Sequence, residues 1–210
     1  MKRLLLLALV ILLFSSCIGI ESNVSFKKDG SGDIVFIYRI SKMLTEMGGE
    51  DAETPLPVSE EALTASVADH PGLTLKKVSQ REDDQDIFIT AEIGFEAIEE
   101  FTGLEDFSAM PMRLEARGGD TVFTQIISEG TGSDGDSEDG SSGEGEMAEM
   151  QAMMQEFFLG YELIFVVNAP SPIKEHNLGE LSGNGRSVTY VIPLLELTAM
   201  QQETVLSVVW

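Results

Sequence analysis

Cys17 is the residue best placed for covalent chemistry, because it is the one cysteine in the 210-residue chain. A thiol can attack an electrophile, form a disulfide, bind a metal or carry a lipid. A single cysteine excludes an internal disulfide and a cysteine-based zinc cluster. The two histidines, His70 and His176, are too few for a histidine-rich metal site. The sequence therefore predicts no metal and no cofactor.

Catalytic motifs are missing from the sequence. It contains neither a G-x-x-x-x-G-K-[ST] phosphate loop nor a G-x-S-x-G nucleophile motif. His70 directly precedes Pro71 at a predicted helix end, which suits a capping or exposed role, and His176 lies in a predicted loop. Carboxylates are plentiful, but most fall in predicted turns and helix flanks, where water solvates them. We therefore predict that the protein is not an enzyme.

The chain is strongly acidic, with 13 basic and 36 acidic residues and a formal net charge of −23. Phosphate groups would be repelled rather than neutralised, so no nucleic-acid partner is expected. A hydrophobic fraction of 43% over 210 residues is enough for one domain with its own core.

The N-terminal residues have the layout of a secretory signal peptide. Lys2 and Arg3 precede an apolar run, Leu4–Phe14, and the small residues Ser15 and Ser16 follow it. At about 1.5 Å per helical residue this run is too short to cross a hydrocarbon core of about 30 Å. We predict a signal peptide over residues 1–16.

Phe14-Ser15-Ser16-Cys17 resembles a bacterial lipobox, although Leu is commoner than Phe three residues before the cysteine. The resemblance implies cleavage before Cys17, diacylglycerol on its thiol and an acyl chain such as palmitate on the new amine. It places the protein in the cell envelope, anchored to the membrane by its N-terminal lipid. Ile18 after the cysteine favours the outer membrane over the outer leaflet of the cytoplasmic membrane. The alternative is an ordinary secreted protein with an incidental cysteine.

Beyond a lipidated tether at residues 17–23, the pattern predicts a single α+β domain over residues 24–210. Its largely antiparallel β-sheet is built of hairpins, with a few packed helices. The predicted strands cover 24–28, 33–41, 73–79, 86–95, 112–117, 121–128, 161–168, 187–192 and 203–210. The predicted helices cover 60–69, 96–102 (with Ala97, Ile98 and Phe101 inward) and 194–202.

Residues 129–146 form an acidic Gly/Ser insert that should be disordered, because its residues cannot bury enough apolar surface to offset their ordering entropy. An EF-hand register counted from Asp134 fails, since Asp139 stands where the loop needs Gly and Gly145 where it needs Glu. We predict no defined metal site there, while weak calcium association stays open.

A methionine-rich amphipathic helix is predicted immediately after the insert. At 100° per residue its apolar side chains fall in one arc of about 140°. Because thioethers adapt to varied apolar partners, this face could cover a hydrophobic ligand together with the 86–95 strand. It could equally pack on the sheet as core. The candidate ligand-lining residues are Met147, Met150, Met154, Phe157, Phe158, Ile89 and Ile93.

The mature chain also resembles the LppM-like domain of exported bacterial lipoproteins. The resemblance rests on Cys17, the turn at Asp29-Gly30-Ser31-Gly32, a central α/β stretch and a late block. That block comprises Ala169-Pro170-Ser171-Pro172-Ile173, His176-Asn177 and the residues from Gly185 to Leu194, with Tyr190 where relatives often carry Trp. It implies a small sheet-and-helix domain outside the cytoplasmic membrane, with lipid or glycolipid binding proposed for some relatives.

Two hypotheses follow. The first is a non-enzymatic, lipid-anchored envelope lipoprotein that binds a hydrophobic or amphipathic, lipid-like ligand. The second is an envelope lipoprotein that docks another protein, or has a structural role, without a small-molecule ligand.

Overall fold

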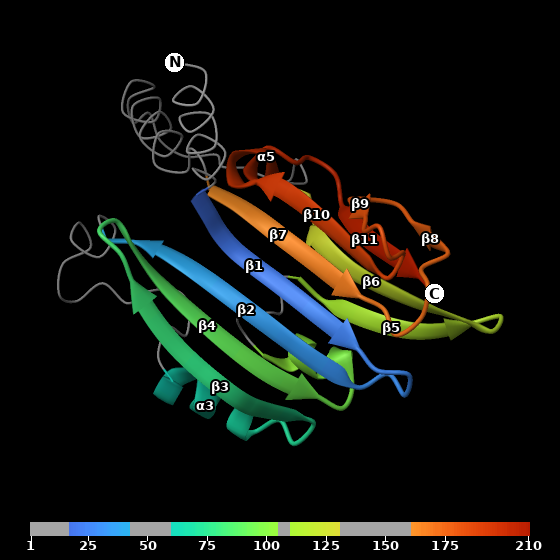
Figure 1. The fold of residues 1–210 in the computed structure, drawn as a ribbon, viewed down its shortest axis with the longest axis horizontal. Coiled ribbons are helices and arrows are strands. Elements are labelled where there is room, and N and C mark those ends of the chain that lie inside the picture. The colour runs from blue at the N-terminus through green and yellow to red at the C-terminus, as the bar shows by residue number, and fades with distance from the viewer. Residues whose placement is uncertain (1–16, 43–59, 105–109, 131–160) are drawn as a thin grey trace, which may run out of the picture.

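The computed structural model describes residues 17–42, 60–104, 110–130 and 161–210, which form two β-sheets and a few short helices (Figure 1). The elements are β1 (Cys17–Phe26), β2 (Gly32–Ser41), α3 (Glu60–Ala68), β3 (Leu73–Glu82), β4 (Asp86–Phe95), the 3-10 helix η1 (Ile98–Gly103), β5 (Met112–Arg117), β6 (Asp120–Ser128), β7 (Tyr161–Asn168), β8 (Glu175–His176), β9 (Glu180–Leu181), β10 (Ser187–Pro193), α5 (Leu194–Thr198) and β11 (Thr204–Val209). The predicted class, largely antiparallel strands with few helices, is confirmed.

Sheet A has seven strands in the order β3-β4-β2-β1-β7-β10-β9, so β1 is its central strand. Neighbouring strands are antiparallel except β1 and β7, which run parallel with Val24 beside Val167. A prediction built on hairpins misses this pair, because alternation along a strand identifies the strand but not a distant partner.

One face of sheet A is apolar and buried. Its alternate residues are at most 6% exposed in the central strands. This inner face includes Val24, Phe26, Ile34, Phe36, Tyr38, Ile89, Ala91, Ile93, Phe95, Leu163, Phe165 and Val167. The predicted alternation in the 33–41 and 86–95 strands is thus confirmed.

Sheet B, with the order β5-β6-β11-β8, packs on this inner face toward the β7 and β10 side (Figure 1). The ring of Phe26 on β1 lies 5.2 Å from the rings of both Phe123 and Trp210, measured between centroids. Phe123, Leu206 and Val208 are fully buried. The core therefore lies between two sheets. The sequence alone predicts a single sheet.

The helices differ from the prediction mainly at their ends. The predicted 60–69 helix is α3, which lies against β3 (Figure 1). The 96–102 segment is the 3-10 helix η1, whose Ile98 and Phe101 are fully buried while Ala97, expected inward, is exposed. The predicted 194–202 helix ends at Thr198, because Ala199 and Met200 donate to carbonyls three residues back and tighten its last turn.

The segment predicted as a lipidated tether, residues 17–23, forms the first part of β1 in the structure. From Ser22 onward the burial alternates along the strand, with Ser22 at 7% and Val24 at 2% exposed and Asn23 between them half-buried. The polar Ser22 and the small Gly19 interrupt the apolar pattern, so the sequence conceals the first part of this strand.

Gly32 shows why β2 begins where it does. A Cβ atom at this residue would lie 2.2 Å from the carbonyl oxygen of Ser25 and 2.5 Å from Cζ of Phe95. Only glycine permits this approach of β1, β2 and β4. The preceding turn is held by Asp29, whose Oδ1 accepts bonds from the backbone N (3.1 Å) and Oγ (2.7 Å) of Ser31.

Candidate functional site

Cys17 stands at one end of sheet A, and the residues around it define the candidate site. At this end β1 begins at Cys17, β2 ends at Ser41, β4 begins at Asp86 and β7 begins at Tyr161. Cys17 is paired with Tyr161, and Ser41 with Asp86. We refer to this region as the Cys17 end of sheet A.

A row of arginine and aromatic side chains crosses the sheet at this end. The guanidinium carbon of Arg81 on β3 lies 4.2 Å from the ring centroid of Phe88 on β4. The guanidinium carbon of Arg39 on β2 lies 5.8 Å from the Phe88 ring and 5.5 Å from the Tyr161 ring on β7. These are cation–π distances. This Arg–aromatic row ties together strands that are far apart in the sequence.

Gly19 allows the row to pass over β1. Because β1 lies between β2 and β7, a contact between Arg39 and Tyr161 must cross it. A Cβ at Gly19 would meet Cδ1 of Tyr161 at 3.3 Å and the carbonyl oxygen of Glu162 at 3.2 Å. The register of β1 against β7 also shifts between Ile18 and Ile20, as expected of a bulge at a glycine.

Arg39 and Asp86 form an ion pair largely removed from water, with side chains that are 11% and 3% exposed. Burying two charges is costly, and their attraction offsets that cost only while both partners remain. The pair joins β2 to the start of β4. Asp86 directly follows the turn that connects β3 to β4.

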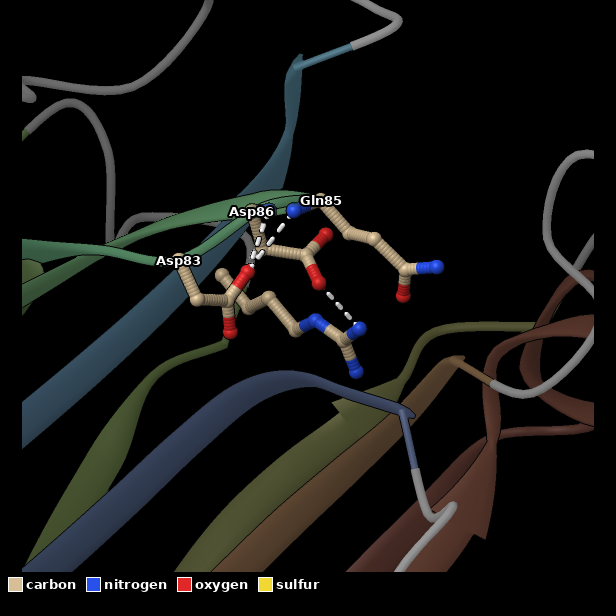
Figure 2. A network of polar contacts seen from close by, with 4 residues as sticks. Asp83, Gln85 and Asp86 are labelled. Carbon is tan, nitrogen blue, oxygen red and sulfur yellow. Dashed lines mark hydrogen bonds and ion pairs between the residues drawn. The ribbon is translucent and has the colours of Figure 1, made fainter.

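The β3–β4 turn is ordered by Asp83. Its Oδ1 accepts hydrogen bonds from the backbone N of Gln85 (2.9 Å) and of Asp86 (2.8 Å), as Figure 2 shows. These two bonds hold the pKa of the Asp83 carboxyl below its ordinary value, and the positive charges of Arg39 and Arg81 lower that pKa further. Lys42, just beyond β2, bonds through its backbone N to the carbonyl of Gln85 (2.9 Å) and through Nζ to Glu82 (3.2 Å).

The inner face of sheet A remains apolar up to the Cys17 end, but there its side chains are only partly buried. They pack against the buried core from β1, β2, β4, β10, α5 and the residues just after α5. The residues are Ile20, Ile40, Ile87, Tyr190, Leu194, Leu197 and Met200. Burial raises the pKa of the Tyr190 hydroxyl above its ordinary value, and the negative charge of Glu196 adds to this.

Of the predicted ligand-lining residues, Ile89 and Ile93 lie on the inner face, at 2% and 0% exposed, within the core. The other predicted lining residues (Met147, Met150, Met154, Phe157 and Phe158) and the acidic insert from residue 131 onward lie outside the described residues. The contact between the two groups therefore stays a prediction.

The two histidines contact a glycine and a backbone carbonyl group. A Cβ at Gly103 would lie 2.7 Å from Cε1 of His70, so the imidazole ring covers the end of η1. His176 is exposed on β8, with Nδ1 3.2 Å from the carbonyl oxygen of Leu178. Within the described ranges, no group of three or more His, Cys, Asp or Glu side chains is arranged to hold a metal ion. Nor does any helix among those residues have the length and apolarity to span a bilayer.

Sequence reasoning missed Arg39, Asp86, Phe88 and Tyr161 as parts of one cluster. Arg39 and Asp86 are separated by 47 residues, and Tyr161 is further away still. A charged residue at an alternate position of an apolar strand, as Arg39 is, was the one available signal.

No protein-family model and no curated protein matches the chain. Among solved structures, it is similar to the NMR structure of the folded domain of LppM from Mycobacterium tuberculosis. The TM-score is 0.49 and the identity 9%, over 92% of this chain and 89% of that chain.

Proposed function

We propose that this chain is a lipid-anchored lipoprotein of the bacterial cell envelope, held to the outer membrane by acyl chains on Cys17. The observation that carries the proposal is the position of the one cysteine. Cys17 directly follows a short apolar leader and is also the first residue of β1. Cleavage before Cys17 would leave the new amino terminus at the start of a paired strand. More than one acyl chain, at about 0.8 kcal/mol per buried methylene, makes a stable anchor.

Mass spectrometry of the full-length protein, produced in a lipoprotein-processing bacterium and taken from its membranes, tests the anchor. We expect the mass of residues 17–210 plus a diacylglyceryl group on sulfur and an acyl group on the amine. Cys17→Ser is the control and should retain its leader without gaining lipid. A bare thiol in the native product, or a leader still attached, would show that the proposal is wrong.

The same proposal assigns the domain a hydrophobic or amphipathic ligand. Its support is the partly exposed apolar surface at the Cys17 end, where Ile20, Ile40 and Ile87 extend the inner face of sheet A beyond the buried core. Ile89 and Ile93 lie deeper on the same face, so a ligand that reached them would have to displace their present neighbours.

Native mass spectrometry of the leaderless Cys17→Ser protein tests the ligand. Copurified lipid is expected, and it should be lost in Ile87→Asn but retained in Thr90→Asn, a change at the outer face of the same strand. Protein without bound lipid in every case would favour the second hypothesis, in which the lipoprotein docks another envelope protein or has a structural role.

The proposal includes no catalysis. It is supported by the surroundings of the two histidines, because the ring of His70 covers Gly103 and His176 lies on an exposed two-residue strand. The imidazole of His176 contacts the carbonyl oxygen of Leu178 through Nδ1 (3.2 Å), which is not a nucleophile.

A further inference from the structure

The first residues after Cys17 do not form a flexible linker. A seven-residue tether could extend about 23–25 Å and would let an anchored domain tumble above the membrane. Instead Cys17 and Ile18 pair with β7, and Ile20 and Glu21 pair with both β7 and β2. An acyl group on the Cys17 sulfur would therefore be separated from the rigid sheet by little more than one side chain.

Side chains of the neighbouring strands also hold the start of β1 in place. Arg39 reaches across it toward Tyr161, and Gly19 is in close contact with the Tyr161 ring. The nearly buried Arg39–Asp86 pair fixes the position of Arg39. Peeling the first residues of β1 from the sheet would break ladder hydrogen bonds on both sides and uncover this row, which opposes the formation of a tether by local fraying.

We propose that the Cys17 end of sheet A rests directly on the lipid bilayer, with the strands rising from it and the Lys27–Ser31 turn held away from the membrane. This rests on the proposed lipidation of Cys17. Among the described residues, the surface in contact with lipid headgroups includes the β3–β4 turn around Gln85, Lys42 just beyond β2, and α5.

The alternative orientation, with the outer face of sheet A flat on the membrane, is opposed by the polar groups of that face. Toward the far end it carries an ion pair between Lys76 and Asp33, and Glu92 lies 3.8 Å from Lys76 Nζ. Asn168 donates to Oδ1 of Asn23 (2.7 Å) on the same face. Moving these groups into the interface would cost their hydration. The Cys17 end carries charges as well, in Glu82, Asp83 and Lys42, but it also offers the partly exposed Ile40 and Ile87, which lose little in the interface.

The height of the far end follows from strand geometry. Ten residues of β1 at about 3.3 Å each separate the Lys27–Ser31 turn from Cys17 by about 30 Å. That distance takes the turn well clear of the headgroups when the strand stands up, and it falls to nearly zero when the sheet lies flat.

Depth-dependent fluorescence quenching of the full, lipidated protein tests the orientation. Cys17 is the one native cysteine and is blocked by lipid, so a cysteine introduced elsewhere can be labelled alone. The variants are Gln85→Cys at the Cys17 end, Lys28→Cys in the far turn and Glu92→Cys on the outer face, all exposed or half-exposed positions. Each labelled protein is reconstituted in phosphatidylcholine vesicles that contain a headgroup spin-labelled lipid.

We expect the label at Gln85→Cys to lose most of its fluorescence, while the labels at Lys28→Cys and Glu92→Cys keep theirs. Equal quenching at positions 85 and 28 would overturn the inference in favour of a freely tumbling domain. Strong quenching at position 92 would overturn it in favour of a sheet lying flat. Protein that does not float with the vesicles would refute the anchor itself, and the orientation with it.

A matched control variant introduces a flexible linker between the anchor and the strand. A flexible Gly/Ser linker inserted between Cys17 and Ile18 leaves the lipidation site and the strand sequence unchanged. Flotation should be unaffected, while the difference in quenching between positions 85 and 28 disappears. If the difference persists, surface contacts rather than the short anchor orient the domain, and the inference is wrong in its cause.

Discussion

At the scale of single residues, Gly19 is a position at the Cys17 end where a side chain would be tightly confined. Its hydrogen occupies a space bounded by the Tyr161 ring and the carbonyl oxygen of Glu162. The strand that follows the predicted lipidation site therefore tolerates no side chain there without a shift of its neighbour. This makes Gly19 a sensitive probe of whether β1 is paired up to its first residues.

Gly19→Ala should destabilise the protein by about 1 kcal/mol, because the added methyl group meets atoms at 3.2 and 3.3 Å. Urea unfolding of the leaderless protein measures the change. Gly183→Ala is the matched control, since a Cβ there meets nothing within 4 Å, and it should alter stability by less than about 0.5 kcal/mol. Equal effects at the two glycines would contradict the packing described for Gly19.

Asp83 predicts a pH dependence of stability. Its folded-state pKa is held below the ordinary value by the backbone hydrogen bonds from Gln85 and Asp86. A depressed pKa contributes stability that is present above the unfolded-state pKa and is lost as the pH falls through the folded-state value.

Asp83→Asn should therefore be less stable than the parent at neutral pH. The gap should close as the pH falls below about 4, the ordinary pKa of an aspartate. Urea unfolding at a series of pH values measures it. Asp84→Asn, the next residue of the turn, controls for the loss of one negative charge. A gap that stays constant down to acid pH would rule out this role for the carboxylate.

At the scale of elements, the Arg39–Asp86 ion pair stabilises the pairing of β2 with β4 at the Cys17 end. Arg39→Met would leave the Asp86 carboxylate nearly buried without its partner, which costs about 3–5 kcal/mol. The double variant Arg39→Met with Asp86→Leu should recover a large part of that loss, because no unpaired charge then remains. Urea unfolding of the two single variants and the double variant forms the cycle, and additive losses would show that the two side chains do not interact.

The strands could be predicted from the sequence much better than their partners. Alternation predicted the strand at 86–95, a glycine turn signal the strand at 112–117 and a β-prone run the strand at 161–168, all at the bounds that the structure has. These local signals could not reveal that β1 runs parallel to β7 or that sheet B covers sheet A, because these contacts join residues far apart in the chain. The same limit concealed the Arg–aromatic row, whose members come from four strands.

At the scale of the whole molecule, Cys17 is both the predicted lipidation site and the first residue of the central strand. Cys17 could be singled out from the sequence, because it is the one cysteine and follows the leader. That it is also the first residue of the central strand could not, since Gly19 and Ser22 interrupt the apolar pattern. A chain with 36 acidic and 13 basic residues is repelled by anionic headgroups, so the proximity of its domain to the bilayer depends on the anchor rather than on charge attraction.

The role of β1 in the whole fold yields the last prediction. If residues 17–23 were a tether, a chain starting at Val24 would be as stable as one starting at Ile18. Because these residues pair with both β2 and β7, the shorter chain loses ladder hydrogen bonds worth about 0.5–1.5 kcal/mol each, together with the burial of Ile20 and Ser22. A domain of this size is stable by about 5–15 kcal/mol in total, so the chain starting at Val24 should lose its cooperative unfolding transition. Thermal unfolding followed by circular dichroism compares the two chains, and the chain starting at Ile18 should keep a single sharp transition. Similar melting curves for both would mean that the start of β1 contributes little, and the rigid link between anchor and sheet would have to be abandoned.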